Sequence, residues 1–134
     1  MKDPMNADRQ LHRLLERRAR AVAQAPDLAE LLRGTVGRRY VRCGKAGCWC
    51  QRGRGHGPVL YLSVSLGVGR TRQITIAREA YRIAQQYVRN YWQLWRSLEA
   101  ISTVNRTLLQ HRLLPAPAAT REPRRRRQRR RRPR

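Results

Sequence analysis

The chain has 134 residues with 31 basic and eight acidic side chains, so its formal net charge is +23. This length allows one small domain with extensions, and a compact domain of this charge repels itself, which implies a polyanionic partner. No apolar run approaches the roughly 20 residues that span a bilayer, and no secretory signal opens the chain, so we expect a cytoplasmic protein.

The first part of the chain predicts helices. Apolar residues follow helical spacing from about residue 7 to residue 25, beginning at Leu11 and ending at Val22. Pro26 and Asp27 end that helix, and the leucines that follow predict a short second helix, which Gly34 closes. We therefore expect residues 1–33 to form an N-terminal helical segment.

All three cysteines and one of the three histidines lie within fourteen residues, at Cys43, Cys48, Cys50 and His56. The spacing is C-x4-C-x-C-x5-H, and four glycines between the ligands let the backbone fold around one point. Three thiolates and an imidazole suit tetrahedral Zn²⁺, and four protein ligands leave no open position for water. This segment therefore predicts a structural zinc knuckle rather than a catalytic metal.

Other interpretations of these residues remain open. Free cysteine is often a small core residue, although the neighbours here are Gly, Lys, Arg and Gln rather than aliphatic residues. One disulfide with a thiol left over would also fit an odd count, although Cys48 and Cys50 are too close for easy bridging. His56 could belong to a turn before the next strand instead of binding the metal.

Alternating apolar residues predict a small antiparallel sheet around the knuckle. Residues 35–42 are expected to form the strand that enters it, and residues 58–66 the strand that leaves it. Residues 67–69 then predict a tight turn, after which residues 70–76 return. The knuckle and sheet together occupy residues 34–77, and the residues expected to face inward are Leu60, Leu62, Val64, Leu66, Ile74 and Ile76.

No proline or glycine interrupts residues 78–112, which predicts one helix of about 50 Å at 1.5 Å per residue. Apolar residues step by four and three along it in a heptad seam, and a polar asparagine in such a seam can fix the register of a coiled coil. The stripe could pack against the first helix and the sheet, but the first helix covers only half of it. A homodimer is therefore the other possibility, through Tyr87, Tyr91, Leu94, Leu98, Ile101, Asn105 and Leu108.

Basic residues gather in the middle of the chain, where no acidic residue occurs between Glu30 and Glu79. Tyr40, Trp49 and Tyr61 are interleaved with these arginines. Guanidinium groups hold phosphates while aromatic rings stack on bases, so this mixture suits nucleic acid. The alternative is that Tyr40 and Tyr61 are core residues and the arginines form an ordinary solvated face. The predicted binding residues here are Arg38, Arg39, Arg42, Lys45, Arg52, Arg54, Arg70 and Arg72.

A second basic segment lies at the C-terminus. Residues 120–134 hold ten arginines and one glutamate, and a Pro- and Ala-rich linker precedes them. Like-charge repulsion and the lack of apolar residues predict that residues 113–134 are disordered. The arginines of this tail that we expect to grip phosphates are Arg124, Arg125, Arg126, Arg127, Arg129, Arg130, Arg131 and Arg132.

The sequence from residue 34 to residue 62 resembles a family of uncharacterised small prokaryotic proteins. The family's hallmark is Cys-Gly-Lys-x-Gly-Cys-x-Cys followed by Gly-x-x-His-Gly-Pro and an aromatic strand, and residues 43–50 and 53–58 carry this pattern. Val59 and Leu60 stand where the family usually has tyrosines. The resemblance covers about residues 31–109 and implies the same fold and metal site, but it adds little about activity.

These patterns together predict an α+β protein with N-terminal helices, a small antiparallel sheet with a Cys3His zinc knuckle, one long C-terminal helix and a disordered arginine-rich tail. The expected function is zinc-stabilised binding of DNA or RNA. We expect no catalytic activity, because no paired carboxylates, Ser-His-Asp set or phosphate loop occurs. The alternative is a protein–protein interaction adaptor or dimerising accessory protein that uses the long helix.

Overall fold

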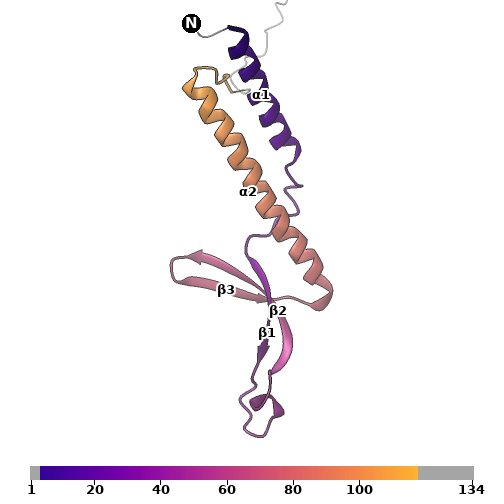
Figure 1. Ribbon diagram of the computed structural model, residues 1–134. Helices are drawn as coiled ribbons and strands as arrows, with labels where there is room; N and C mark the ends of the chain where they lie inside the picture. The colour runs from indigo at the N-terminus through magenta and orange to yellow at the C-terminus, as the bar shows by residue number, and fades with distance from the viewer. Residues whose placement is uncertain (1–3, 118–134) are drawn as a thin grey trace, which may run out of the picture.

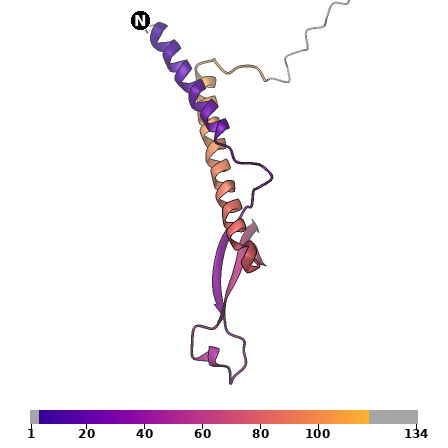
Figure 2. The ribbon, with the colours of Figure 1, turned by 90° about the vertical axis from the view of Figure 1, so that its right-hand side faces the viewer.

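The computed structural model describes residues 4–117 and confirms the α+β class, with two helices and a three-stranded antiparallel sheet (Figure 1). The two helices lie side by side at one end of an elongated molecule, and the sheet lies at the other end (Figure 2). Residues 118–134 of the tail predicted to be disordered lie outside the described residues. In chain order the elements are α1 (Pro4–Ala23), β1 (Thr35–Val41), the 3₁₀ helix η1 (Trp49–Gln51), β2 (His56–Gly67), β3 (Arg70–Thr75), the 3₁₀ helix η2 (Arg78–Ala80) and α2 (Tyr81–Gln110).

Helix α2 packs against α1 along one face, with the two helices antiparallel. Arg18 Nη1 donates a hydrogen bond to Asn105 Oδ1 at 3.1 Å, and Gln93 Nε2 donates to the carbonyl oxygen of Gln24 at 2.6 Å. Ala21 is buried on the α1 side, where a small side chain lets the helices approach closely. The buried residues of α2 recur at intervals of seven and four, the spacing of one helix face, at Asn90, Ser97, Val104 and Leu108.

The segment between α1 and β1 has turns but no helix, so the short second helix predicted there is wrong. The Asp27 side chain accepts a hydrogen bond at 2.9 Å from the backbone N–H two residues later, which favours a turn. Helix α2 supplies partners for the backbone beyond it. Asn90 Nδ2 donates to the Glu30 carbonyl at 3.0 Å, and the Leu32 N–H donates to the Tyr87 carbonyl at 3.2 Å. These bonds replace the hydrogen bonds that a helix would have made.

Strand β2 is the centre of the sheet, and its two neighbours pair with different parts of it. Strand β1 pairs with residues 56–63 of β2, whereas β3 pairs with residues 61–67, so residues 61–63 alone have both neighbours. The sheet is therefore built from two diverging two-stranded arms. The β1–β2 arm ends in the cysteine-rich loop, which comprises residues 42–55, and the β2–β3 arm ends in the turn after Gly67 (Figure 1).

The hydrophobic core is small. Among residues 4–117, five apolar and two polar side chains are buried. Leu62 is the buried apolar residue that the described strands contribute to this core. Leu66 and Ile74, which we predicted to face inward, are 50% and 44% exposed. The reason is that the β2–β3 arm leaves the helices, so nothing covers the apolar face that its alternation creates (Figure 1). The strands were predicted correctly, but the extent of their burial was not.

Candidate metal centre and basic surface

The β1–β2 ladder brings the two ends of the cysteine-rich loop together. Its last pair joins Val41 to His56, so His56 begins β2 directly opposite the point where the chain leaves β1 for Cys43. Gly55 fits against this base with a φ of +100°, and a Cβ there would lie 3.0 Å from the Val41 carbonyl oxygen. A glycine is therefore needed where the loop closes.

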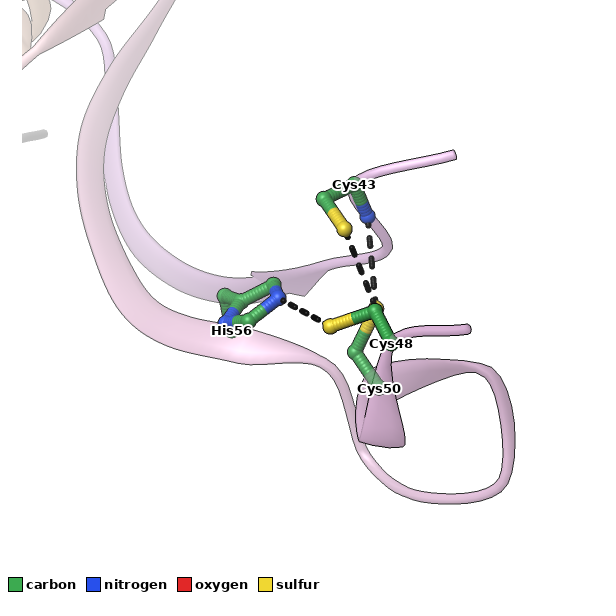
Figure 3. Close-up of side chains that lie close together, drawn as sticks. All are labelled: Cys43, Cys48, Cys50 and His56. Carbon is green, nitrogen blue, oxygen red and sulfur yellow. Dashed lines mark hydrogen bonds between the residues drawn. The ribbon is translucent and has the colours of Figure 1, made fainter. Parts of the chain in front are cut away.

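A tight turn and η1 fold the rest of the loop back toward that base. The Cys48 N–H donates to the Lys45 carbonyl at 3.0 Å, and the Gln51 N–H donates to the Cys48 carbonyl at 3.1 Å. Cys48 is extended, with φ −78° and ψ 138°, and Cys50 follows inside η1. This change of backbone conformation directs both sulfurs to the same side despite the single intervening residue (Figure 3).

Figure 3 shows the four predicted ligands converging, and their ligand atoms all lie within 4.8 Å of one another. Cys43 Sγ is 3.6 Å from Cys50 Sγ, and Cys48 Sγ is 3.2 Å from His56 Nε2. In a tetrahedral zinc site, bonds of about 2.3 Å to sulfur and 2.0–2.1 Å to nitrogen separate neighbouring ligand atoms by roughly 3.5–3.8 Å. The four ligand atoms therefore lie close enough together to hold one metal ion. The cysteines are free, so the disulfide interpretation is wrong.

The three thiols lie in different electrostatic surroundings. The backbone N–H of Lys45, with the side chains of His56 and Cys50, stabilises the Cys43 thiolate and lowers its pKa from 9.0 to about 6. The Cys43 N–H lowers the pKa of Cys50, but desolvation by burial and the neighbouring thiols raise it more, so the net pKa of Cys50 is raised. One thiol is thus prepared to bind a cation, while the buried one needs a cation to lose its proton.

Residues beside the ligands support them, and sequence reasoning did not assign them this role. Cys50 Sγ accepts hydrogen bonds from the Cys43 N–H at 3.4 Å and from Gln51 Nε2 at 3.9 Å. The Trp49 and His56 rings pack in a T-shaped arrangement with their centroids 4.9 Å apart. Such contacts orient ligands and stabilise thiolate charge. The one signal in the sequence is that Trp49 and Gln51 flank a ligand on both sides.

The eight basic residues predicted to bind nucleic acid within the domain are all exposed, but they do not form one flat patch. Arg38 and Arg39 are successive residues of β1 and therefore lie on opposite faces of the arm. Arg70 lies at the start of β3 on the other arm, with Arg72 two residues after it. The basic residues of the cysteine-rich loop are Arg42, Lys45, Arg52 and Arg54. The eight predicted tail arginines lie outside the described residues.

Two of these arginines stack on tyrosines. The Arg39 guanidinium lies 5.3 Å from the centroid of the Tyr61 ring, and that of Arg54 lies 4.9 Å from the Tyr40 ring. Arg54 Nη1 also donates to the Tyr40 hydroxyl at 3.2 Å. Tyr40 is exposed and Tyr61 is half-buried, so neither belongs to the fully buried core. The glutamine that holds Arg39 from β3, Gln73, was not predicted.

The predicted oligomerisation residues on α2 have different surroundings. Leu108 is fully buried within the chain and Asn105 accepts a hydrogen bond from Arg18, so both serve the contact between helices. Leu98 is 50% exposed. Trp92 and Trp95, outside the predicted seam, are 50% and 51% exposed and widen the free apolar face. The half-buried members of the seam are Tyr87, Tyr91, Leu94 and Ile101.

A groove of about 840 Å³ lies where the sheet meets the start of α2, and sequence reasoning missed it. Arg38 from β1 and Arg78 and Arg82 from the start of the helical region line it. The spacing of four residues between Arg78 and Arg82 was the available signal, since it places both on one side of a helical turn. Their convergence with Arg38 follows from tertiary structure alone.

Comparisons with known proteins agree with the predicted resemblance. No curated protein and no solved structure matches the chain. Within residues 4–117, no helix is both long and apolar enough to cross a membrane. One family model matches residues 9–86, which hold most of α1, the whole sheet, the four clustered ligands and the first residues of α2. The chain therefore belongs to the family described as a domain of unknown function (DUF6788).

Proposed function

We propose that this chain is a nucleic-acid-binding protein whose basic arms are held in shape by a zinc ion. The observation that carries the proposal is the charge of the middle of the chain. Ten basic residues and no acidic residue lie between Glu30 and Glu79. Among the described residues the only ion pair joins His12 and Glu16, so no carboxylate neutralises an arginine of the arms. Unneutralised and exposed guanidinium groups are suited to phosphates.

Zinc is the ion that best suits the clustered ligands, because three thiolates and an imidazole in tetrahedral array are typical of structural zinc sites. The ion would stabilise the conformation of the cysteine-rich loop. Residues 42–55 contribute only one buried side chain, that of Cys50, so apolar packing cannot hold this loop in place. A bound ion would fix the loop and with it the positions of Arg42, Lys45 and Arg54.

The arginine–tyrosine pairs would supply contacts to bases. A guanidinium stacked on a ring is already ordered, and it loses less entropy when it meets a phosphate. Tyr40 is 39% exposed, which leaves ring surface for a base to contact. These features support binding to exposed bases and phosphates, but they do not distinguish DNA from RNA.

The test measures binding of a labelled oligonucleotide to the full chain by fluorescence anisotropy. Arg39→Gln/Arg54→Gln removes both stacked guanidiniums, and Arg9→Gln/Arg13→Gln removes the same charge from the exposed surface of α1. We expect the first variant to weaken binding at least tenfold and the second less than threefold. A third variant, with the eight tail arginines replaced by glutamine, measures the contribution of the tail. Equal losses for the first two variants, or no binding by the unmodified chain, would refute the proposal.

A second candidate function is self-association through α2, and the exposed apolar face of that helix favours it. Successive helix residues turn by about 100°, so Trp95 projects roughly 160° away from Ser97, which faces α1. Trp92, Trp95 and Leu98 are each about half exposed. They leave on the order of 300 Å² of apolar surface per copy. We propose that a second copy of this chain covers the face. One chain buries few apolar side chains, so burial of this face in a dimer would add to its stability.

Burial of about 600 Å² in a dimer would contribute at most roughly 15 kcal/mol, and association costs about 4–15 kcal/mol, so the net free energy of dimerisation is small. We therefore expect a weak dimer that dissociates at micromolar concentration. Sedimentation of Trp95→Gln/Leu98→Gln should show a monomer where the unmodified chain is dimeric. The matched control is Leu28→Gln/Val68→Gln, which removes exposed apolar residues elsewhere. A dimer with a micromolar dissociation constant should be mostly associated at about 100 micromolar. An unmodified chain that is still monomeric at that concentration would contradict the proposal.

A further inference from the structure

The groove at the junction of the sheet and α2 has the properties of a ligand site. Its volume of about 840 Å³ lies within the range of roughly 300–1,000 Å³ that is typical of small-molecule sites. Its apolar part comes from Leu60 of β2 and from Ile76, which follows the end of β3, and Tyr81 adds an aromatic ring. The Ile76 N–H donates to the Leu60 carbonyl at 2.8 Å, which ties the two apolar residues together.

Three arginines give this groove its charge. The guanidiniums of Arg38, Arg78 and Arg82 make no hydrogen bond or ion pair with any other residue of the described chain. Glu79 is the one acidic residue that lines the groove, and it has no ion-pair partner among residues 4–117. The groove therefore carries a net positive charge that no group among residues 4–117 neutralises by an ion pair, and an anion would be its complement.

The start of α2 adds to this potential. Helix α2 has 30 residues, no side chain caps its N-terminus, and its first turn contains no acidic residue. The N-terminal end of its dipole lies beside Tyr81 and Arg82, which line the groove. The dipole reinforces the arginines and favours a phosphate at this end of the groove.

We propose that the groove holds one nucleotide of a single-stranded segment. The base lies against Leu60, Ile76 and the Tyr81 ring, and the adjoining phosphates contact the three arginines. Apolar residues and positive charge in one recess match a ligand with a flat base and an anionic backbone. A recessed base cannot stay paired, so the site selects unpaired over duplex nucleic acid. This inference rests on the proposed function and adds a structural preference to it.

The test uses the full chain with two probes, a 12-nucleotide single strand of uridines and a mixed-sequence duplex of about the same length. This length lies within the roughly 4–16 nucleotides that one small single-strand-binding domain covers. Arg38→Gln/Arg82→Gln removes two guanidiniums from the groove, and Arg9→Gln/Arg13→Gln removes the same charge from α1. We expect the groove variant to lose about tenfold or more in affinity for the single strand, because two charge-assisted phosphate contacts are lost. The loss for the duplex should be less than threefold, because a paired base does not enter the groove. The control variant should change both affinities less than threefold.

A second measurement locates the base directly. A single strand that carries 4-thiouridine should crosslink under ultraviolet light to the peptide that contains Tyr81, and mass spectrometry identifies that peptide. Crosslinks confined to other peptides would overturn the inference, as would equal losses of single-strand and duplex binding in the groove variant. In either case the wild-type chain would still bind nucleic acid. Failure of the wild-type chain to bind either probe would instead refute the proposed function itself.

Discussion

Replacement of Cys50 by serine tests the metal centre most sharply. Cys50 is the one ligand with a fully buried side chain, and its sulfur accepts hydrogen bonds from the Cys43 N–H and from Gln51. Serine keeps nearly the same size but offers a hydroxyl, which is a poor ligand for zinc. The substitution therefore removes a ligand and disturbs the contacts around it without adding bulk.

The size of the effect follows from the number of ligands. Structural zinc sites bind with about 10–16 kcal/mol, so one ligand of four accounts for roughly 2.5–4 kcal/mol. This corresponds to an affinity loss of roughly 10²- to 10³-fold. Residues 42–55 have no other buried side chain to replace the metal, so the loop should lose its structure when the ion leaves. The helix pair, which includes Val104 and Leu108, should stay folded.

Competition with a chelator of known affinity measures the loss, and elemental analysis gives the stoichiometry, which should be one ion per chain. Ala46→Ser is the control, because it places serine in the same loop at an exposed position. His56→Asn and His111→Asn form a second matched pair, and only the first should weaken metal binding. Hydrogen exchange should show loss of protection in residues 42–55 after chelation. Protection of residues 42–55 that persists in metal-free wild-type protein, or a Cys50→Ser affinity within threefold of wild type, would refute the reasoning.

Three further outcomes are expected. In metal-free protein at pH 7, iodoacetamide should modify the three cysteines at similar rates, because the folded loop that lowers the pKa of Cys43 to about 6 and raises that of buried Cys50 should lose its structure without the ion. Mass spectrometry that finds Cys43 modified first, at a rate that falls as pH drops through about 6, would show that the loop stays folded and would contradict this. Gly34→Ala should lower the free energy of unfolding by about 1–3 kcal/mol, because φ is +145° and a Cβ would lie 2.7 Å from the Ser63 carbonyl oxygen; Gly47→Ala, which meets open space, is the control in urea denaturation. If six to eight phosphates are neutralised, log affinity should fall by about five to seven per tenfold rise in salt, and a flat dependence would argue against phosphate contacts.

The strands and the metal ligands were predictable because their signals are local. Alternation over residues 58–66 and 70–76 reflects the two-residue period of a strand, and the ladder follows from two such segments joined by a short turn. Three thiols and an imidazole within fourteen residues are the donor set of a structural zinc site, so their clustering could be predicted. What the pattern could not show was that Leu66 and Ile74 stay exposed, because burial depends on where the helices lie.

The spacing of side chains along this sequence determined its helices, its strands and the ligand set, because each depends on chemistry within a few residues. Tertiary structure alone decided which face of α2 contacts α1 and which face, with Trp95 at its centre, stays free. It also decided that the segment after Asp27 forms no helix, because residues of α2 supply hydrogen-bond partners for the backbone groups of that segment. The meeting of Arg38 with Arg78 and Arg82 is likewise tertiary, because they are separated by about forty residues in sequence and their approach depends on how the sheet docks onto the helix.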